Sequence, residues 1–238
     1  MSTWVKVARF HLLAEPFYYV AGPWLAAAAP FLVIWAIFLL SPAQHSAPNF
    51  IATKQSDPAA LMLQIVFVTA SGIFSIKRSL PLALSLGVSR RTYYTGTALL
   101  AVGLSAVFGL ALALLQALDL ATNGWGVGMH QFWFPWLLQG PWYLTWWTTF
   151  ALLALAFSYG MWCGVVYWRW HVAGVMAFVA AQALVLAAAV VVASLRDAWP
   201  GVGQFFLSLG PGGVTVVLVL LALLILGGGY ATVRRAPV

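Results

Sequence analysis

The chain has 238 residues, of which 63% are hydrophobic and only 6% are charged. Soluble domains carry about 25% charged residues, so this composition excludes an ordinary soluble domain and indicates an integral membrane protein. The net charge of +7 is compatible with nucleic-acid binding, but the placement of the basic residues along the chain favours a membrane topology and no nucleic-acid partner. The single cysteine, Cys163, lies in an apolar run, and the sequence shows no Cys/His cluster typical of a metal site.

A short amphipathic segment at residues 4–15 precedes the long apolar runs. Lys6 and Arg9 share one face of this segment, which is typical of a helix lying in the membrane interface. Runs of about 20 apolar residues, enough to cross the hydrocarbon core, then follow one another along the chain. The six predicted spans are residues 17–40, 59–76, 94–118, 142–166, 172–195 and 214–233. We therefore expect a single all-α transmembrane domain over residues 1–238, with a short loop at 196–212 that has room for one helical piece at 204–209.

The basic residues fall on one side of this predicted topology. If the N-terminus is cytoplasmic, only Lys54 and Arg196 are placed outside the membrane. The residues placed inside are Lys6, Arg9, Lys77, Arg78, Arg90, Arg91, Arg169, Arg234 and Arg235. This bias follows the positive-inside rule and predicts that both termini are cytoplasmic.

The run KRSLPLALSLGVSRRTYYTG, at residues 77–96, lies between the second and third predicted spans. Ser79 is expected to cap a helix of about two turns at residues 80–86, which Gly87 would end in a left-handed conformation. Ser89 is expected to cap the next helix. The short helix is apolar but cannot cross a membrane, so we expect it to contact a separate protein. The alternative is that its flanking cations only keep the loop on the cytoplasmic side.

Small residues recur every four positions in the third, fourth and fifth predicted spans. Such stripes let helices approach closely, either within one bundle or across a dimer seam. No charged side chain lies in the middle of a span, so any pathway is expected to have apolar walls and to carry a hydrophobic or amphipathic molecule. Gln64 and Gln182 are its most polar candidates, with hydrogen bonding between helices as the alternative role. Trp133 and Trp136 lie in an aromatic stretch that is either an interfacial belt or an exit gate for a lipid-like molecule.

Catalytic motifs are not evident. A P-loop requires a glycine before its lysine, and the three lysines follow Val5, Thr53 and Ile76. An intramembrane serine protease would need a serine turn and a later histidine, for which Ser158 and His171 are only a weak match. The chain is therefore not expected to be an enzyme by itself, and energy from ATP would have to come from another chain.

The run LALSLGVSRRTYYTG, at residues 82–96, resembles the first cytoplasmic loop of bacterial type-2 ABC exporter permeases. In that family a coupling helix ends in a Gly-x-Ser-Arg-Arg-type turn before the third span. The interfacial helix, the six spans and the short turn between spans four and five are similar as well. The resemblance implies a multi-pass permease of the bacterial cytoplasmic (inner) membrane that carries drugs or lipids. It also implies a second permease subunit, identical or homologous, and two separate ABC ATPase subunits that hold ATP and Mg²⁺, with no cofactor in this chain.

The same resemblance implies which residues contact the ATPase. Residues 80–86 would lie in a groove of the ATPase, with arginines on either side and a second contact from the interfacial helix. The implied contact residues are Arg78, Leu80, Leu82, Leu84, Leu86, Gly87, Arg90, Arg91, Lys6 and Arg9. Two other functions stay open: a membrane assembly or sensory partner without transport activity, and an intramembrane enzyme.

Overall fold

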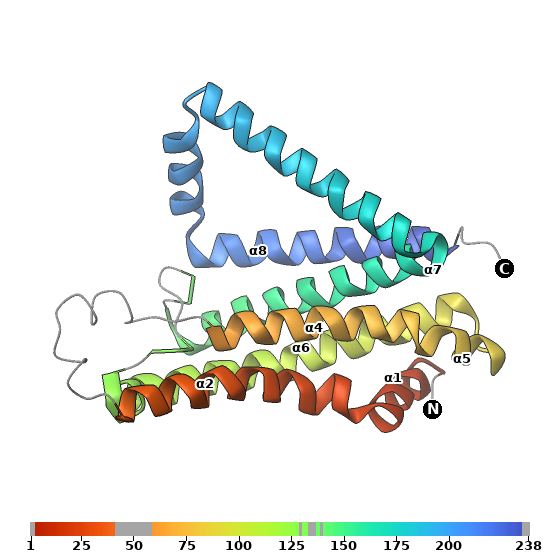
Figure 1. Ribbon diagram of the computed structural model, residues 1–238, viewed down its shortest axis with the longest axis horizontal. Coiled ribbons are helices and arrows are strands. Elements are labelled where there is room, and N and C mark those ends of the chain that lie inside the picture. Colours follow the sequence, from red (N-terminus) through yellow and green to blue (C-terminus); the bar gives the residue numbers. More distant parts are fainter. Residues whose placement is uncertain (1–2, 41–58, 129, 133–136, 139, 235–238) are drawn as a thin grey trace.

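The computed structural model describes residues 3–40, 59–128, 130–132, 137–138 and 140–234 (Figure 1). Every regular element in this part of the chain is helical. In chain order the elements are α1 (Thr3–Ala14), η1 (Phe17–Ala21), α2 (Gly22–Leu40), α4 (Ala59–Lys77), α5 (Ser79–Ser85), α6 (Arg90–Ala121), η3 (Gly124–Gly128), α7 (Trp142–Leu195) and α8 (Trp199–Arg234). The expectation of an all-α protein is thus confirmed over the described residues.

Several of these helices are long and apolar enough to cross a membrane. Within the described ranges there are five such segments: Phe17–Ile37, Ala60–Ser85, Arg90–Ala121, Trp142–Leu195 and Trp199–Arg234. The fourth of them contains two of the six expected spans, which are two helices joined by a sharp kink at the short turn expected between them. At His171 the backbone of α7 leaves the helical conformation (φ 55°, ψ −153°), and the chain reverses direction there (Figure 1).

The segment between the last two expected spans is more helical than predicted. A loop was expected at residues 196–212, but α8 already begins at Trp199. The helix then breaks at Gly210, whose φ of 59° is readily adopted by glycine. The short piece expected at residues 204–209 is therefore the last part of a longer helical segment.

Glycines allow α4 and the first limb of α7 to pack in direct backbone contact. A Cβ atom added at Gly160 would overlap the carbonyl oxygen of Thr69 and lie 3.1 Å from the Cα of Gly72. Farther along α7, a Cβ at Gly164 would lie 2.9 Å from the Cβ of Ile76. The small residues of the fourth predicted span thus pack within this chain, which is one of the two alternatives for such stripes.

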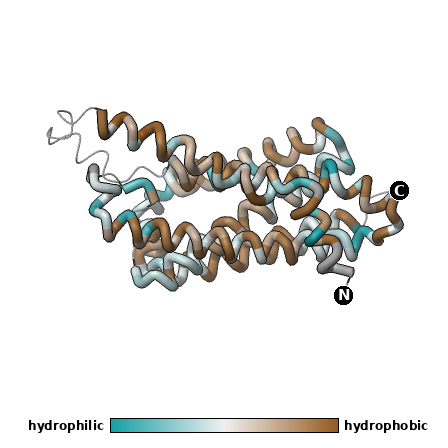
Figure 2. Tube along the Cα trace, turned by 90° about the horizontal axis from the view of Figure 1, so that it is seen from below, coloured by the Kyte–Doolittle hydropathy of each residue, from teal (hydrophilic) through white to brown (hydrophobic). Residues whose placement is uncertain are grey.

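The second limb of α7 and the first part of α8 leave the bundle. We call residues 172–209 the arm; in Figure 1 it forms two sides of a triangle whose third side is the rest of α8. Its apolar side chains are largely uncovered, with Leu184 71% exposed and Leu195 80% exposed. The first limb of α7 supplies all of the buried residues of that helix, from Thr145 to Val166. Hydrophobic residues dominate most of the length of the helices (Figure 2). Most residues of the arm are exposed.

One end of the bundle gathers elements that are far apart in sequence. Figure 1 shows the start of α1, the whole of α5, the break in α7 and the end of α8 at this end, whereas η3 lies at the opposite end. Because the basic residues flank these elements, we call this the basic end.

Candidate functional site

Helix α5 is held between α4 and α6 by two short backbone turns. α4 ends at Lys77, and α5 begins one residue later at Ser79. Ser79 was expected to cap this helix, and that prediction is wrong: Arg78 occupies the cap position with no side-chain cap hydrogen bond, and Ser79 is buried as the first helical residue. The short connection between the two helices leaves no extended residue that could place a hydroxyl at the cap.

The C-terminus of α5 follows the predicted pattern. Gly87 has a φ of 79°, its amide donates to the Leu84 carbonyl at 3.0 Å, and the Val88 amide donates to the Ala83 carbonyl at 3.0 Å. This pair of hydrogen bonds is a Schellman motif. Ser89 then accepts a hydrogen bond from the Thr92 amide at 3.2 Å and caps α6 as expected. Both ends of the turn are thereby fixed by local hydrogen bonds.

The two faces of α5 have different environments. Leu80 is 1% exposed and Ala83 is 5% exposed, so this face packs against the rest of the chain. On the other face, Leu82 is 50% exposed and Leu86 is 68% exposed, while Leu84 is half-buried. Of the leucines expected to contact a partner, Leu80 is therefore an anchor to this chain, and Leu82 and Leu86 form the accessible pair.

An arginine and a carboxylate connect α1 to the start of α5. The Arg78 Nη1 lies 3.9 Å from the Glu15 Oε1, and the guanidinium lies over the ring of Tyr18 with 5.4 Å to its centroid. The Tyr18 carbonyl in turn accepts a hydrogen bond of 2.6 Å from Ser71 of α4. The segment from Glu15 to Tyr18 is thus in contact with both α4 and the residue that precedes α5.

A buried histidine fastens α1 to α6. The side chain of His11 is 1% exposed, and its Nε2 lies 3.1 Å from the Thr97 Oγ1. The rings of Tyr19 and Tyr93 meet it edge-on at 5.1 and 5.4 Å. Burial lowers the pKa of His11 from 6.5 to about 4, so the ring is neutral near pH 7. Tyr93 also donates a hydrogen bond to the Ser75 carbonyl of α4, and α1, α4 and α6 are joined by this aromatic group.

Cations at the basic end lie on aromatic rings next to the break in α7. The Lys77 Nζ is 4.6 Å from the centroid of the Tyr167 ring, and the Arg90 guanidinium is 5.1 Å from that of Trp168. Such cation–π contacts contribute about 0.5–1 kcal/mol each at exposed sites. The two residues that flank the α5 turn thus contact the end of the first limb of α7.

The remaining residues implied as ATPase contacts are mostly accessible. The side chains of Arg9, Arg78 and Arg91 are exposed, as is Gly87, and that of Arg90 is half-buried. Lys6 lies in α1, but its side chain falls outside what the structure describes. Arg78 directly precedes α5, and Arg90 and Arg91 follow its C-terminal turn, so positive charges flank Leu82 and Leu86 along the chain.

The four candidate pathway residues do not form one group in the described structure. Gln64 is fully buried in α4, and its amide has no hydrogen-bond partner among the described residues. Gln182 lies on the arm, where its Oε1 accepts a hydrogen bond of 2.8 Å from the Tyr159 hydroxyl of the first limb. Trp133 and Trp136 lie outside the described residues.

A second polar contact lies at the opposite end of the bundle and was not predicted. The Nδ1 of His130 is 3.4 Å from the Oδ1 of Asp119. The ten residues between them include the end of α6 and the irregular η3 turn, so no fixed spacing in the sequence indicates the contact.

Comparisons with protein-family models, with curated proteins and with solved structures find no match to this chain.

Proposed function

We propose that this chain is the membrane permease subunit of an ATP-driven exporter of the type-2 ABC class, resident in a bacterial cytoplasmic membrane. The proposal places six crossings in the bilayer, with the two limbs of α7 as separate crossings and the last crossing after Gly210. It places the basic end, with both termini, in the cytoplasm. The positive-inside bias of the sequence supports this orientation, because Lys77, Arg78, Arg90, Arg91, Arg169 and Arg234 all belong to elements at that end.

The observation that carries the proposal is the two-faced character of α5. A helix of seven residues would not be stable alone, and here Leu80 and Ala83 fix it to the bundle. Its free face nonetheless presents Leu82 and Leu86 beside exposed arginines. An exposed apolar face on a fixed helix, flanked by cations, suits a protein surface with an apolar groove and acidic rim. In this proposal the groove belongs to a separate ATPase subunit.

The contacts around α5 offer a route by which movement of the ATPase reaches the spans. Arg78 joins α5 to Glu15 and Tyr18, and Lys77 joins the end of α4 to Tyr167 of α7. A displacement of α5 would therefore act on α1, α4 and α7 together. Rigid-body movement of these helices is the proposed means of opening the pathway.

An apolar groove between α4, α7 and α8 supports a hydrophobic or amphipathic substrate. It has a volume of about 320 Å³ and is lined by Ile65, Thr69, Leu152, Leu155, Ala156, Tyr159, Leu221 and Ile225. Charged groups do not contribute to its lining. Its size and walls suit an acyl chain or another apolar group better than a strongly hydrophilic molecule.

The test is co-purification with a P-loop ATPase encoded in a neighbouring reading frame. The Leu82→Asp and Leu86→Asp variants should each release the ATPase, because each places a carboxylate in the apolar contact. Asn123→Asp is the matched control: it adds one negative charge at an exposed position of the opposite end, where φ is 51° and Asn or Asp is tolerated. ATPase retention by both leucine variants, at wild-type levels of membrane insertion, would refute the docking proposal.

The uncovered arm favours a second candidate function, that of a non-transporting assembly or sensory partner in a larger membrane complex. Its apolar side chains are exposed along most of residues 172–209 and are available for contact with other membrane proteins. Reconstitution with the ATPase separates the two functions. ATP-dependent movement of a fluorescent hydrophobic probe across the vesicle membrane is expected of a permease, and ATPase binding without such movement supports the assembly role.

A further inference from the structure

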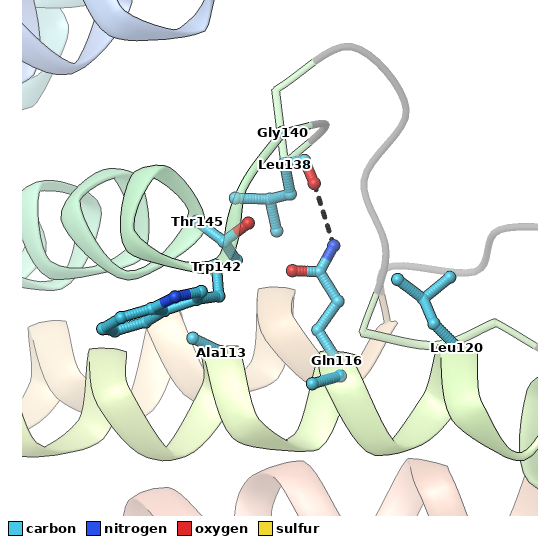
Figure 3. Close-up of a pocket in the computed structure, with 8 residues that line it drawn as sticks. Ala113, Gln116, Leu120, Leu138, Gly140, Trp142 and Thr145 are labelled. Carbon is cyan, nitrogen blue, oxygen red and sulfur yellow. Dashed lines mark hydrogen bonds between the residues drawn. The ribbon is translucent and has the colours of Figure 1, made fainter.

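A cavity lies between α6 and the start of α7, at the end of the bundle opposite α5 (Figure 3). It has a volume of about 300 Å³. Its lining comes from α6, from the segment before α7 and from the first turn of α7: Ala113, Gln116, Ala117, Leu120, Leu138, Gly140, Trp142 and Thr145. None of these residues lines the apolar groove between α4, α7 and α8, so the two spaces are separate.

The cavity has a buried inner wall and an exposed rim. Ala113, Leu138 and Thr145 of the inner wall are each at most 5% exposed. At the rim, the side chains of Leu120 and Trp142 are more than half exposed. A small molecule can therefore enter from the surface beside Leu120 and Trp142 and reach the buried wall.

A buried amide directs its oxygen into this cavity. Gln116 is 5% exposed, and its Nε2 donates a hydrogen bond of 2.9 Å to the Leu138 carbonyl. A carbonyl oxygen only accepts hydrogen bonds, so the nitrogen of the amide must face Leu138 and the oxygen must face the other way. Figure 3 shows the Gln116 Oε1 and the Thr145 hydroxyl directed into the space between α6 and α7. Neither oxygen has a hydrogen bond with another residue that the structure describes.

These two polar groups indicate what kind of ligand group the cavity takes. A buried amide oxygen without a partner is costly and can only accept, so its complement is a hydrogen-bond donor. The described lining residues are all uncharged, so the charge of an ammonium group would be buried without compensation. A hydroxyl group is neutral, and it can donate to Gln116 while it accepts from the Thr145 hydroxyl.

The volume and the remaining walls indicate the rest of the ligand. An apolar cavity of about 150 Å³ is known to hold a benzene molecule, so about 300 Å³ has room for roughly two fused rings or an apolar chain of similar size. Ala113, Leu138 and the ring of Trp142 supply apolar and aromatic surface for such a body. A strongly hydrophilic molecule would leave most of its polar groups without partners on these walls.

We propose that this cavity binds a neutral amphipathic alcohol or phenol. The ligand hydroxyl donates to the Gln116 Oε1 and accepts from the Thr145 hydroxyl, and its apolar body lies against Leu138 and Trp142. The bound molecule joins α6 to the start of α7 at this end of the bundle. The site rests on neither the ATPase contact at α5 nor the proposed transport function.

The experiment is equilibrium dialysis of the full-length protein with 2-naphthol, whose intrinsic fluorescence reports its concentration. The same detergent concentration on both sides of the membrane cancels partition of the probe into micelles. We expect one saturable site per chain. The related probe 2-methoxynaphthalene has the same rings but no hydroxyl donor, and it should bind about 5- to 10-fold more weakly.

Three variants assign the binding to the two polar groups. Gln116→Met keeps the length of the side chain but removes the acceptor, so the preference for 2-naphthol over 2-methoxynaphthalene should disappear. Thr145→Val leaves the bond between Gln116 and Leu138 in place and should weaken both probes, because an ether oxygen also accepts from the hydroxyl. Gln182→Met, which removes an amide on the arm, is the matched control and should bind both probes as the wild type does.

Three results overturn the proposal. The first is binding of 2-naphthol that does not saturate, and the second is equal affinity of the two probes for the wild type, as expected if water alone fills the cavity. The third is a preference for 2-naphthol that persists in Gln116→Met. If Gln116→Met does not give a folded protein, Thr145→Val decides in its place, and wild-type affinity of that variant for 2-naphthol also overturns the proposal.

Discussion

The packing of α4 against α7 leads to a prediction for Gly160→Ala. The added methyl group would overlap the Thr69 carbonyl oxygen and lie 2.9 Å from the Thr69 carbonyl carbon. Real Cβ atoms essentially never approach another atom closer than 3.0 Å, so relieving the overlap with the oxygen requires the two helices to separate by at least about 1 Å. All of the atoms concerned belong to the backbone and cannot rotate away. Overpacking of this kind costs about 1–3 kcal/mol.

The single cysteine provides the assay. Cys163 lies one turn beyond Gly160 and is buried, so a thiol-reactive fluorophore should report unfolding of this contact during heating. For a chain of this size, each kcal/mol lowers Tm by about 2–4 °C, so we expect Gly160→Ala to lower Tm by about 2–12 °C. The matched control is Gly103→Ala in α6, where an added Cβ meets no atom within 4 Å. Replacing that helical glycine should leave Tm unchanged or raise it, since alanine favours the helix by about 0.5–1 kcal/mol.

The outcome that would refute this reasoning is a Gly160→Ala protein with the Tm of Gly103→Ala or of the wild type. It would mean that α4 and α7 do not pack backbone to backbone.

Two further predictions concern the basic end. Leu80→Ala should destabilise the protein by about 2–5 kcal/mol, because Leu80 is 1% exposed. Leu82→Ala, on the free face of α5, should have little effect on Tm. Equal shifts of Tm in the two variants would contradict the assignment of faces. His11 has a pKa of about 4 in the folded protein and near 6.5 in the unfolded chain. The free energy of unfolding should therefore fall by up to about 3 kcal/mol between pH 6.5 and pH 4, because the unfolded chain binds the proton first. Below pH 4 the histidine should cause no further loss. Denaturant titrations at several pH values should show this loss in the wild type and a flatter profile in His11→Gln; identical profiles would count against burial of the neutral ring.

The parts of the fold that depend on neighbouring residues could be predicted from the sequence. Gly87 and Ser89 act through hydrogen bonds within four residues, and the structure forms both as expected. The prediction for Ser79 failed because the direction of the chain after α4 decides whether Ser79 caps α5 or joins it. Apolar run length located the long helices, and the short turn expected between the fourth and fifth spans corresponds to the break at His171.

The parts of the fold that depend on distant contacts could not be predicted. Lys77 and Tyr167 are 90 positions apart, and His11 and Thr97 are 86 apart, so no periodicity relates them. The sequence also did not indicate that His11 is buried, because its sequence neighbours are typical of an interfacial helix. The pairing of Asp119 with His130 depends on the path of an irregular turn, for which sequence patterns carry little information.

The arm has a consequence for how the protein should be handled. Few side chains of this chain cover residues 172–209, so in a bilayer we expect the acyl chains of neighbouring lipids to cover the arm. Those lipids take the place that interior side chains have in a soluble protein. Extraction replaces these lipids with detergent, so the detergent chosen for purification then covers the arm in their place.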